Sequence, residues 1–337
     1  MGQTTADSAD RSRTPPRVSG CVAGLGQCSL DFLCTIERYP PPDTKCEFDD
    51  FLVQGGGPVA TALVVLVRWG VSARFSGVVC PDRFGRMILQ GLGDEGVDTS
   101  ALLIREGSRS QFAFICVEKG TGSRTIFWGR PDAPPFLPGD LPEYFLKDVA
   151  ALHLDGLFLD ASLDLAKKAK DRQIPVILDA GSLRPGMLDL IRLTDHLIAA
   201  ENFLRAFVPS SSITSRLFRI KEMGPQVVTV TLGRHGSVSL WDDVPYELPA
   251  LPVEARDTTG AGDVFHGAYI YGLLQGWEPP ERIRWATVAA GLSCRHLGGR
   301  SGIPTLEEVS GRLSEPGAFL PVDEGRWKDP SVSMRSG

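Results

Sequence analysis

The sequence predicts an α/β fold with a mostly parallel central sheet, helices on both of its faces, and a second, small β-sheet. Three observations indicate this architecture. Short apolar runs alternate with amphipathic stretches through residues 149–199. Two β-rich segments, at about residues 31–53 and 101–128, interrupt the alternation. A glycine-rich turn near residue 260 leads directly into an apolar stretch of helical length.

The alternating part predicts βαβ units, because parallel strands are joined by crossover helices. Residues 149–154, 174–178 and 196–199 are apolar runs of strand length, and the amphipathic residues 161–170 and 187–193 lie between them. We therefore expect one sheet covered on both faces. Another buried strand and two long helices are expected further on, at residues 227–231, 262–274 and 282–294.

The interrupting segments have the pattern of a β-hairpin rather than of a βαβ unit. Residues 111–117 and 124–128 are β-rich, and the turn sequence Lys-Gly-Thr-Gly separates them. We expect this hairpin to pair with the 31–53 segment in a sheet outside the main layer. A sheet at that edge would form a lid that excludes water from a reaction between bound substrates.

The 337 residues, of which 42% are hydrophobic, are enough to bury one large core. Polar sequence without periodicity predicts a disordered tail at residues 1–16 and a loose tail at 321–337. Residues 17–320 are therefore expected to form a single domain that includes the two lid segments.

Charge and cysteine usage limit the class of partner. A net charge of −6 provides no basic field for nucleic acid or anionic lipid, and no apolar run is long enough to cross a bilayer, so we expect small-molecule partners. The seven cysteines contain no C-x-x-C pair and follow no secretory signal, which predicts reduced thiols and a cytoplasmic location.

The most informative stretch is Asp-Thr-Thr-Gly-Ala-Gly-Asp at residues 257–263. The amides of Gly260, Ala261 and Gly262 would lie at a helix N-terminus, where the helix dipole favours a phosphate. A carboxylate directly after such a site repels a static anion unless it accepts a proton. Asp263 is therefore a candidate base for an attacking hydroxyl, and the alternative is that it only caps the helix.

The string D-T-T-G-A-G-D-x-F-x-G-A resembles the C-terminal signature of the PfkB, or ribokinase, family of carbohydrate and nucleoside kinases. The resemblance covers about residues 17–315. It implies a ribokinase-like three-layer α/β/α fold with a small β-sheet lid, and ATP and Mg²⁺ as cofactors. It also implies that Gly260, Ala261 and Gly262 form the anion hole and that Asp263 is the catalytic base.

The resemblance implies an acceptor site in the first quarter of the chain. Gly56 and Gly57 resemble the family's sugar-contacting glycines, and glycine lets the backbone approach a sugar closely. Thr61 stands where the family usually has Asn, so one sugar contact is altered or lost. Asp31 resembles the family's early Asp, whose carboxylate accepts hydrogen bonds from substrate hydroxyls.

Thr231, Gly233 and Gly236 resemble the strand and turn that hold the nucleotide in the family. No Walker A sequence occurs, so the phosphates are not expected to be held by a P-loop. The family's N-x-x-E motif, which belongs to the Mg²⁺ environment, is incomplete. Glu201 stands at the Asn position and becomes the candidate Mg²⁺ ligand, and the acidic residue three positions later is absent.

Ribokinase-like enzymes often hold a monovalent cation by backbone carbonyls near this signature. The resemblance implies that a K⁺ site would involve the loop around Asp257 and Thr259 together with the glycine-rich turn at residues 298–302.

The leading hypothesis is transfer of the γ-phosphoryl group of ATP to a primary hydroxyl of a ketose or a ribose-like sugar. A nucleoside kinase of the same fold is one alternative; it would need an apolar or aromatic slot for a base, and the sequence does not place Phe112, Phe127 and Trp128 well enough to decide. Another alternative is a catalytically weak protein that binds a sugar or nucleotide and acts through a protein partner. The altered Thr61 and Glu201 positions keep this alternative open, whereas the intact stretch from Gly260 to Asp263 argues against it.

Two further expectations concern the lid. Arg124 or Arg130 would add a positive charge near the sugar or the phosphates, or would be a solvated surface residue. The apolar lid positions Phe112, Phe114 and Ile126 would be protected from water in a homodimer formed through the lid.

Overall fold

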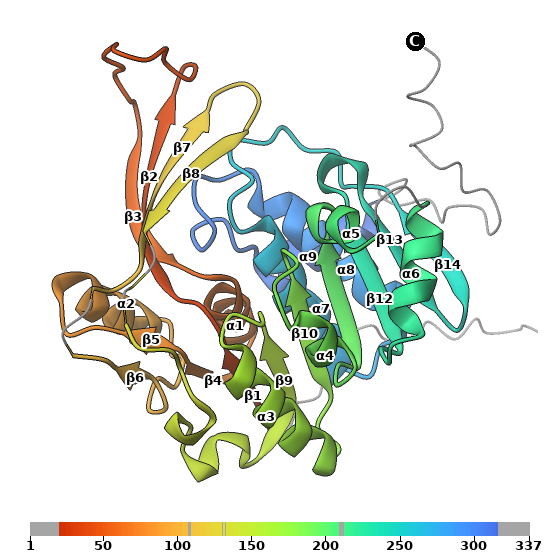
Figure 1. Cartoon of the computed structure of the whole chain (residues 1–337). Helices are drawn as coiled ribbons and strands as arrows, with labels where there is room; N and C mark the ends of the chain where they lie inside the picture. Colours follow the sequence, from red (N-terminus) through yellow and green to blue (C-terminus); the bar gives the residue numbers. More distant parts are fainter. Residues whose placement is uncertain (1–19, 107–108, 130, 132, 209–211, 316–337) are drawn as a thin grey trace, which may run out of the picture.

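Eight strands form the central sheet, in the order β14-β13-β12-β11-β10-β9-β1-β4 (Figure 1). Every neighbouring pair from β4 to β12 is parallel, and β13 and β14 continue the sheet antiparallel. The bounds are β1 Cys21–Leu25, β4 Ser72–Ser76, β9 Val149–Leu154, β10 Val176–Ala180, β11 His196–Ala200, β12 Val227–Thr231, β13 Ser237–Trp241 and β14 Val244–Leu248.

This computed structural model describes residues 20–315 apart from 107–108, 130, 132 and 209–211. The tails expected at residues 1–16 and 321–337 lie outside the described residues, as does Arg130. Among the described residues, no helix combines the length and the apolar character that a membrane span requires.

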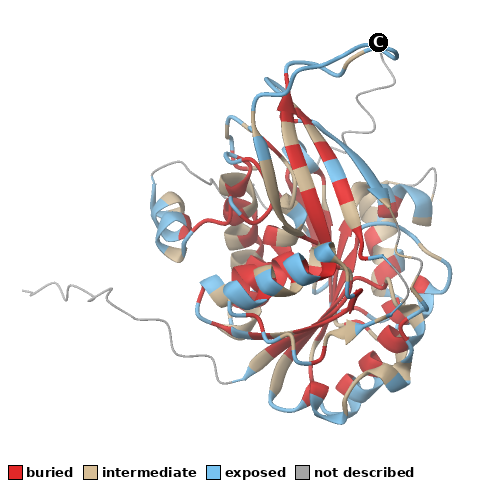
Figure 2. Ribbon diagram, turned by 90° about the vertical axis from the view of Figure 1, so that its left-hand side faces the viewer, coloured by how far each residue is buried: buried red, intermediate tan, exposed pale blue. Residues whose placement is uncertain are grey.

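Helices cover both faces of the sheet, so the expected three-layer α/β/α arrangement is confirmed (Figure 2). Successive residues of β1 point to opposite layers: Val22 belongs to the core beneath α1, α7 and α8, and Ala23 to the core beneath α3 and α4. The first layer contains α1 Pro58–Arg68, α7 Ala261–Leu274, α8 Pro279–Ser293 and α9 Leu306–Ser314. The second contains α3 Leu159–Asp171, α4 Met187–Ile191, α5 Glu201–Phe207 and α6 Ile213–Lys221.

The central helix α7 is buried on most of its surface because it contacts both α1 and α8. Its close approach to α1 depends on Gly267. A Cβ atom at this position would lie 2.6 Å from Cβ of Val65 and 2.7 Å from the carbonyl oxygen of Ala62. A larger residue would push the two helices apart, so Gly267 helps to fix the position of the N-terminal turn of α7.

A separate four-stranded sheet, which we call the lid, stands over one end of the main sheet (Figure 1). Its order is β3-β2-β7-β8; β2 and β7 are parallel and the other two pairs are antiparallel. Residues 103–104 lie outside it and pair with 78–79 in a two-stranded sheet, and α2 (Arg83–Asp94) packs against β2 and β3. The lid strands are β2 Ser29–Ile36, β3 Phe51–Gly56, β7 Phe112–Glu118 and β8 Arg124–Gly129.

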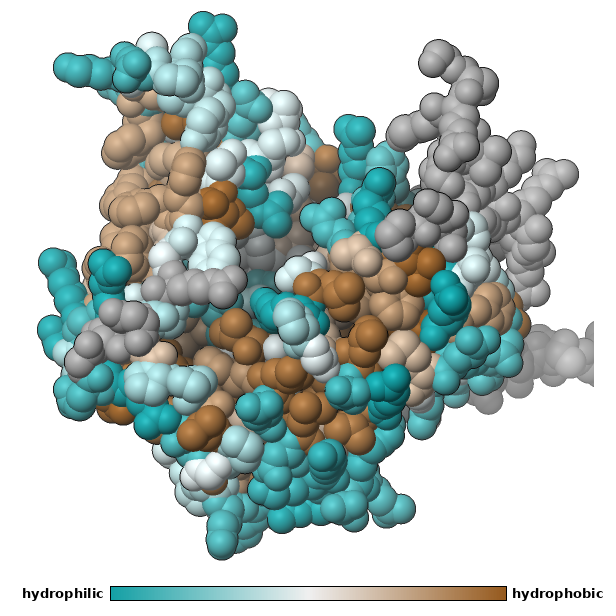
Figure 3. Space-filling model, viewed as in Figure 1, coloured by the Kyte–Doolittle hydropathy of each residue, from teal (hydrophilic) through white to brown (hydrophobic). Residues whose placement is uncertain are grey.

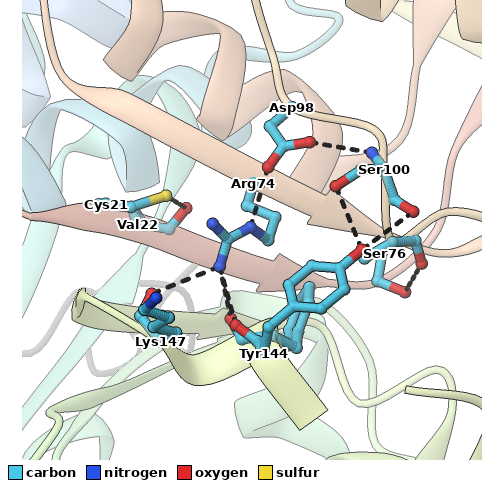
Figure 4. Close-up of polar contacts among 10 residues, drawn as sticks. Cys21, Val22, Arg74, Ser76, Asp98, Ser100, Tyr144 and Lys147 are labelled. Carbon is cyan, nitrogen blue, oxygen red and sulfur yellow. Dashed lines mark hydrogen bonds and ion pairs between the residues drawn. The ribbon is translucent and has the colours of Figure 1, made fainter. Parts of the chain in front are cut away.

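The edge strand β4 is covered by a polar cluster around Arg74 (Figure 4). The guanidinium of Arg74 donates to Asp98 at 2.9 Å and to the carbonyl oxygens of Tyr144 and Lys147 at 3.1 and 3.4 Å. The Tyr144 hydroxyl lies 3.3 Å from Oγ of Ser100. These contacts tie two connecting segments across the edge, which closes it to pairing with another strand.

Candidate active site

The three predicted anion-hole residues lie together at the N-terminal turn of α7, where the N–H of Ala261 bonds to the carbonyl oxygen of Thr258 at 3.3 Å. Gly260 precedes the helix in the left-handed region, with φ of 75°, and its carbonyl oxygen accepts the N–H of Val264 at 2.9 Å. A Cβ atom at Gly262 would meet nothing within 4 Å, so the space beside the helix end is open. An anion can therefore reach the first turn of the helix.

Asp263 lies in this first turn. Burial raises the pKa of its carboxyl to about 8, and the neighbouring negative charges of Asp179 and Asp31 act in the same direction. Arg124 and Arg300 oppose the shift. A carboxylate with a pKa near neutrality is well suited to accept a proton from a hydroxyl group.

The lid contributes a second carboxylate to the same place. Asp31 on β2 is buried, and it accepts a hydrogen bond from Oγ of Ser29 at 2.7 Å. Its Oδ2 lies so close to Gly56 that a Cβ atom there would be only 2.0 Å away. Burial raises the pKa of Asp31. Because its charge also affects Asp263, the two carboxylates face a common region.

The structure gives the other two predicted acceptor residues different surroundings. Gly57 precedes α1 with φ of 100°, and a Cβ atom there would lie 2.2 Å from the carbonyl oxygen of Gln27, so only glycine fits. Thr61 is buried in the first turns of α1 with 2% of its surface exposed, and its N–H bonds to the Gly57 carbonyl oxygen at 2.9 Å. Its contact with a substrate stays a prediction.

The far end of the lid bonds directly to the residues before the anion hole. Arg124 Nη1 donates to Oγ1 of Thr258 at 2.7 Å, and this hydroxyl donates to the carbonyl oxygen of Gly122 at 3.2 Å. Arg256 forms an ion pair with Asp50 at 2.8 Å. In the space-filling view the surface is hollowed between the lid and the main domain (Figure 3). The lid thus spans this hollow and contacts both of its sides.

The predicted nucleotide residues lie at the carboxyl end of β12. Thr231 ends this strand and donates through Oγ1 to the carbonyl oxygen of Ala199 at 3.4 Å. Gly233 begins a short 3₁₀ turn with open space beside its Cα, whereas Gly236 is packed against the carbonyl oxygen of Leu248. Ligands of open α/β sheets bind beyond the carboxyl ends of the strands, and these residues are at that edge.

The residues predicted to bind a cation differ in whether their side chains already have partners. Glu201 begins α5 and is paired with Arg205 at 2.5 Å. Asp257 is buried and accepts two backbone N–H groups, from Thr259 at 2.8 Å and from Gly298 at 2.7 Å. Oγ1 of Thr259 is buried and has no hydrogen-bond partner among the described residues. Across residues 20–315, excluding the gaps, no group of three His, Cys, Asp or Glu side chains could hold a metal ion.

Two residues near the site were not identified from the sequence. Asp179, on β10, lies 3.7 Å from Nδ1 of His266 and influences Asp263. Its position at the end of a predicted strand was the available signal, because the carboxyl ends of parallel strands meet at one edge. Arg300 is buried beside Gly55, and no sequence pattern indicated where its side chain would point.

A half-buried carboxyl with a raised pKa, an open helix N-terminus and a lid that carries a second carboxylate together point to a class of protein. Phosphoryl transfer needs mainly positioning, stabilisation of negative charge and a group that orients or deprotonates the nucleophile. The fold and the site are those of a phosphotransferase that acts on an alcohol group.

The chain belongs to the pfkB family of carbohydrate kinases, whose model matches residues 22–306. It is 28% identical over 297 residues to ribokinase from Bacillus subtilis, and the match covers 87% of this chain and 99% of the relative. It is 25% identical over 317 residues to fructokinase-1 from Zea mays, covering 86% and 96% of the two chains.

Solved structures agree with this assignment. Ribokinase from Thermotoga maritima superposes with a TM-score of 0.76 at 25% identity, covering 88% of this chain and 100% of that one. Ribokinase from Arabidopsis thaliana, solved with ribose and ATP, has a TM-score of 0.76 at 23% identity, with 88% and 99% covered. The ribokinase-like fold expected from the sequence is confirmed.

Replacing Gly260 with Ala should damage the predicted anion hole. The new Cβ would lie 2.5 Å from Cα of Gly299 and would also strain the left-handed backbone. We expect turnover to fall by about 100-fold or more, a loss typical of a displaced oxyanion donor. Gly276→Ala is the matched control, because Gly276 has φ of 72° but open space around it. Equal activity in the two variants, measured by steady-state kinetics, would contradict the assignment.

Proposed function

We propose that this protein phosphorylates a primary hydroxyl of a ketose or ribose-like sugar, using ATP as the donor and Asp263 as the general base. The observation that carries the proposal is the half-buried carboxyl of Asp263, with a pKa raised to about 8 by loss of solvent, in the first turn of a helix whose end is open. The similarity to ribokinase and fructokinase supports a sugar as the acceptor.

In the proposed reaction the acceptor lies between the two carboxylates. Asp31 accepts hydrogen bonds from sugar hydroxyls, which fixes the orientation of the ring. Asp263 takes the proton of the attacking hydroxyl as its oxygen bonds to the γ-phosphorus, and the bond from phosphorus to the ADP oxygen breaks. The amides of Gly260, Ala261 and Gly262 stabilise the negative charge on the transferring group.

ATP is proposed to lie along the carboxyl end of β12, against Thr231, Gly233 and Gly236. Kinases handle ATP as its magnesium complex. The described residues form no carboxylate cluster for Mg²⁺, so the ion would be carried mainly by the nucleotide and by water. Glu201 is the proposed protein contact, and it would have to exchange its ion pair with Arg205.

One observation favours a nucleoside as an alternative acceptor. The strand register places Trp128 opposite Ala113, and Ala113 opposite Asp31, so the indole lies on the same face of the lid as the acceptor carboxylate. Half of the Trp128 surface is exposed. A purine or pyrimidine could stack there, as could the apolar face of a sugar.

Replacing Asp263 with Asn tests the general base. With Mg·ATP and a panel of ketoses, aldoses, sugar acids and nucleosides, the wild type should release ADP with one acceptor class, and the variant should be slower by several orders of magnitude while still binding ATP. The wild-type kcat/KM should rise with pH up to about 8, and the variant should lack this dependence.

The same variant also provides its own folding control. The pKa of Asp263 is raised from 3.8 to about 8 on folding, so ionisation of this carboxyl reduces stability as pH rises through that interval. The neutral amide of the Asp263→Asn variant cannot ionise, and we expect its melting temperature at pH 8 to be no lower than that of the wild type. Undiminished turnover by the variant would overturn the base assignment. If the wild type binds ATP but releases no ADP with any acceptor of the panel, the sugar- or nucleotide-binding regulatory role would be favoured.

A monovalent cation such as K⁺ is proposed to bind near Asp257 and Thr259, because the Thr259 hydroxyl is buried without a partner among the described residues. Such a cation would stiffen the turn before the anion hole. We expect turnover to be several-fold higher in potassium than in sodium or in a bulky organic cation. Equal rates in all three buffers would remove this site.

We also propose a homodimer formed through the outer face of the lid. Phe51, Phe114 and Phe127 are at least half exposed there, and a band of apolar side chains follows this edge of the lid in Figure 3. Phe112 is only partly exposed, and Ile126 is exposed on the opposite face, since it pairs with Ile115.

The Phe114→Glu variant should sediment as a monomer at micromolar concentration, whereas the wild type should sediment as a dimer. Val244→Glu is the control, because Val244 is an exposed apolar residue on β14, which belongs to the main sheet rather than to the lid. A monomeric wild type would contradict the proposal.

A cytoplasmic location also remains a proposal, supported by seven cysteines that are all free thiols.

A further inference from the structure

Arg300 has a buried side chain in contact with the acceptor loop. Only 4% of its surface is exposed. Its Nη2 donates to the carbonyl oxygen of Gly56 at 3.3 Å, and its guanidinium lies so close to Gly55 that a Cβ atom there would be 2.2 Å from Nη1. Its Nε is buried without a hydrogen-bond partner among the described residues.

The backbone around Arg300 is held from two sides. Its carbonyl oxygen accepts a hydrogen bond from Nη1 of Arg68, at the end of α1, at 2.7 Å. The next residue, Ser301, donates its N–H to Oε1 of Gln54 on β3 at 3.4 Å. The guanidinium is therefore anchored to the main domain while it contacts the strand that leads into the acceptor loop.

A buried guanidinium is costly unless negative charge compensates it. Arg300 interacts electrostatically with both carboxylates of the candidate site, and its positive charge lowers the pKa of Asp31 and of Asp263. Burial raises both pKa values. Arg300 thus opposes the protonation that burial favours.

The charged groups that act on Asp263 come from several elements. Asp179 on β10 and Asp31 on β2 are negative, whereas Arg124 on β8 and Arg300 are positive. Arg124 belongs to the lid and bonds to Thr258 from there, so its distance from the base depends on the lid. Arg300 follows α8 in the main domain, and its guanidinium contacts the end of the lid strand β3 that leads into the acceptor loop.

We propose that Arg300 is a positioning residue of the active site, which fixes the backbone of Gly55 and Gly56 beneath the acceptor and supplies a permanent positive charge to Asp31 and Asp263. This inference rests on the proposed role of Asp263 as the base. It assigns a function to a side chain that is neither a predicted ligand of the substrate nor part of the anion hole.

The test compares the pH dependence of kcat/KM in three variants. Arg300→Gln removes the charge, Arg300→Lys keeps it, and Gly55→Ala displaces the guanidinium by occupying its space. In the Arg300→Gln and Gly55→Ala variants, the acidic limb of the pH profile, which is the range where kcat/KM rises with pH, should move to higher pH. A displacement of one pH unit lowers the rate at pH 7 by about tenfold, with recovery at high pH. Arg300→Lys should retain a limb close to that of the wild type.

Arg295→Gln is the control for loss of a positive charge, because Arg295 is exposed in the same part of the chain. A purely structural role would lower activity at every pH or reduce the melting temperature without moving the limb. An unmoved limb in both the Arg300→Gln and the Gly55→Ala variants would overturn the proposal, and should one of them fail to fold, the other decides. Failure of the proposed function is distinguishable, because Asp263→Asn would then remain active.

Discussion

The buried carboxylate of Asp257 holds together two turns at the candidate active site. One oxygen accepts the N–H of Thr259 and the other accepts the N–H of Gly298, at 2.8 and 2.7 Å. The first turn leads into α7 and the second follows α8, and they touch where Gly260 meets Gly299. Both turns lie outside the helices and strands, so this side chain helps to fix the backbone that would receive a phosphate.

Burial has opposite consequences for stability and for chemistry at this site. The negative charges of Asp31 and Asp179 both act on the carboxyl of Asp263. In water these three carboxylates would all be ionised near pH 7 and poorly basic. Their proximity and burial raise the pKa of Asp263 to about 8, which makes it a better base and also makes its ionised form unfavourable for folding.

Local patterns allowed much of the fold to be predicted, because short segments carry their own periodicity and turn signals. The strand at residues 149–154, the hairpin around residue 120 and the start of α7 near residue 261 have the predicted positions. Contacts between distant segments were not predictable. Arg124 bonds to Thr258, 134 residues later, and the buried position of Arg300 depends on α1 and β3 together. Such contacts join residues far apart in the chain and depend on tertiary packing, so no local sequence pattern indicates them.

Two of the connections between the lid and the main domain are short. β1 ends at Leu25 and β2 begins at Ser29, and β3 ends at Gly56 immediately before α1, so these joins are only a few residues long and touch where Gly57 meets Gln27. Asp31 lies near these joins, whereas Arg124 lies at the opposite end of the lid, where it bonds to Thr258 of the main domain. The lid is therefore attached to the main domain at both ends, covalently beside Asp31 and by hydrogen bonds of Thr258 with Arg124 and Gly122.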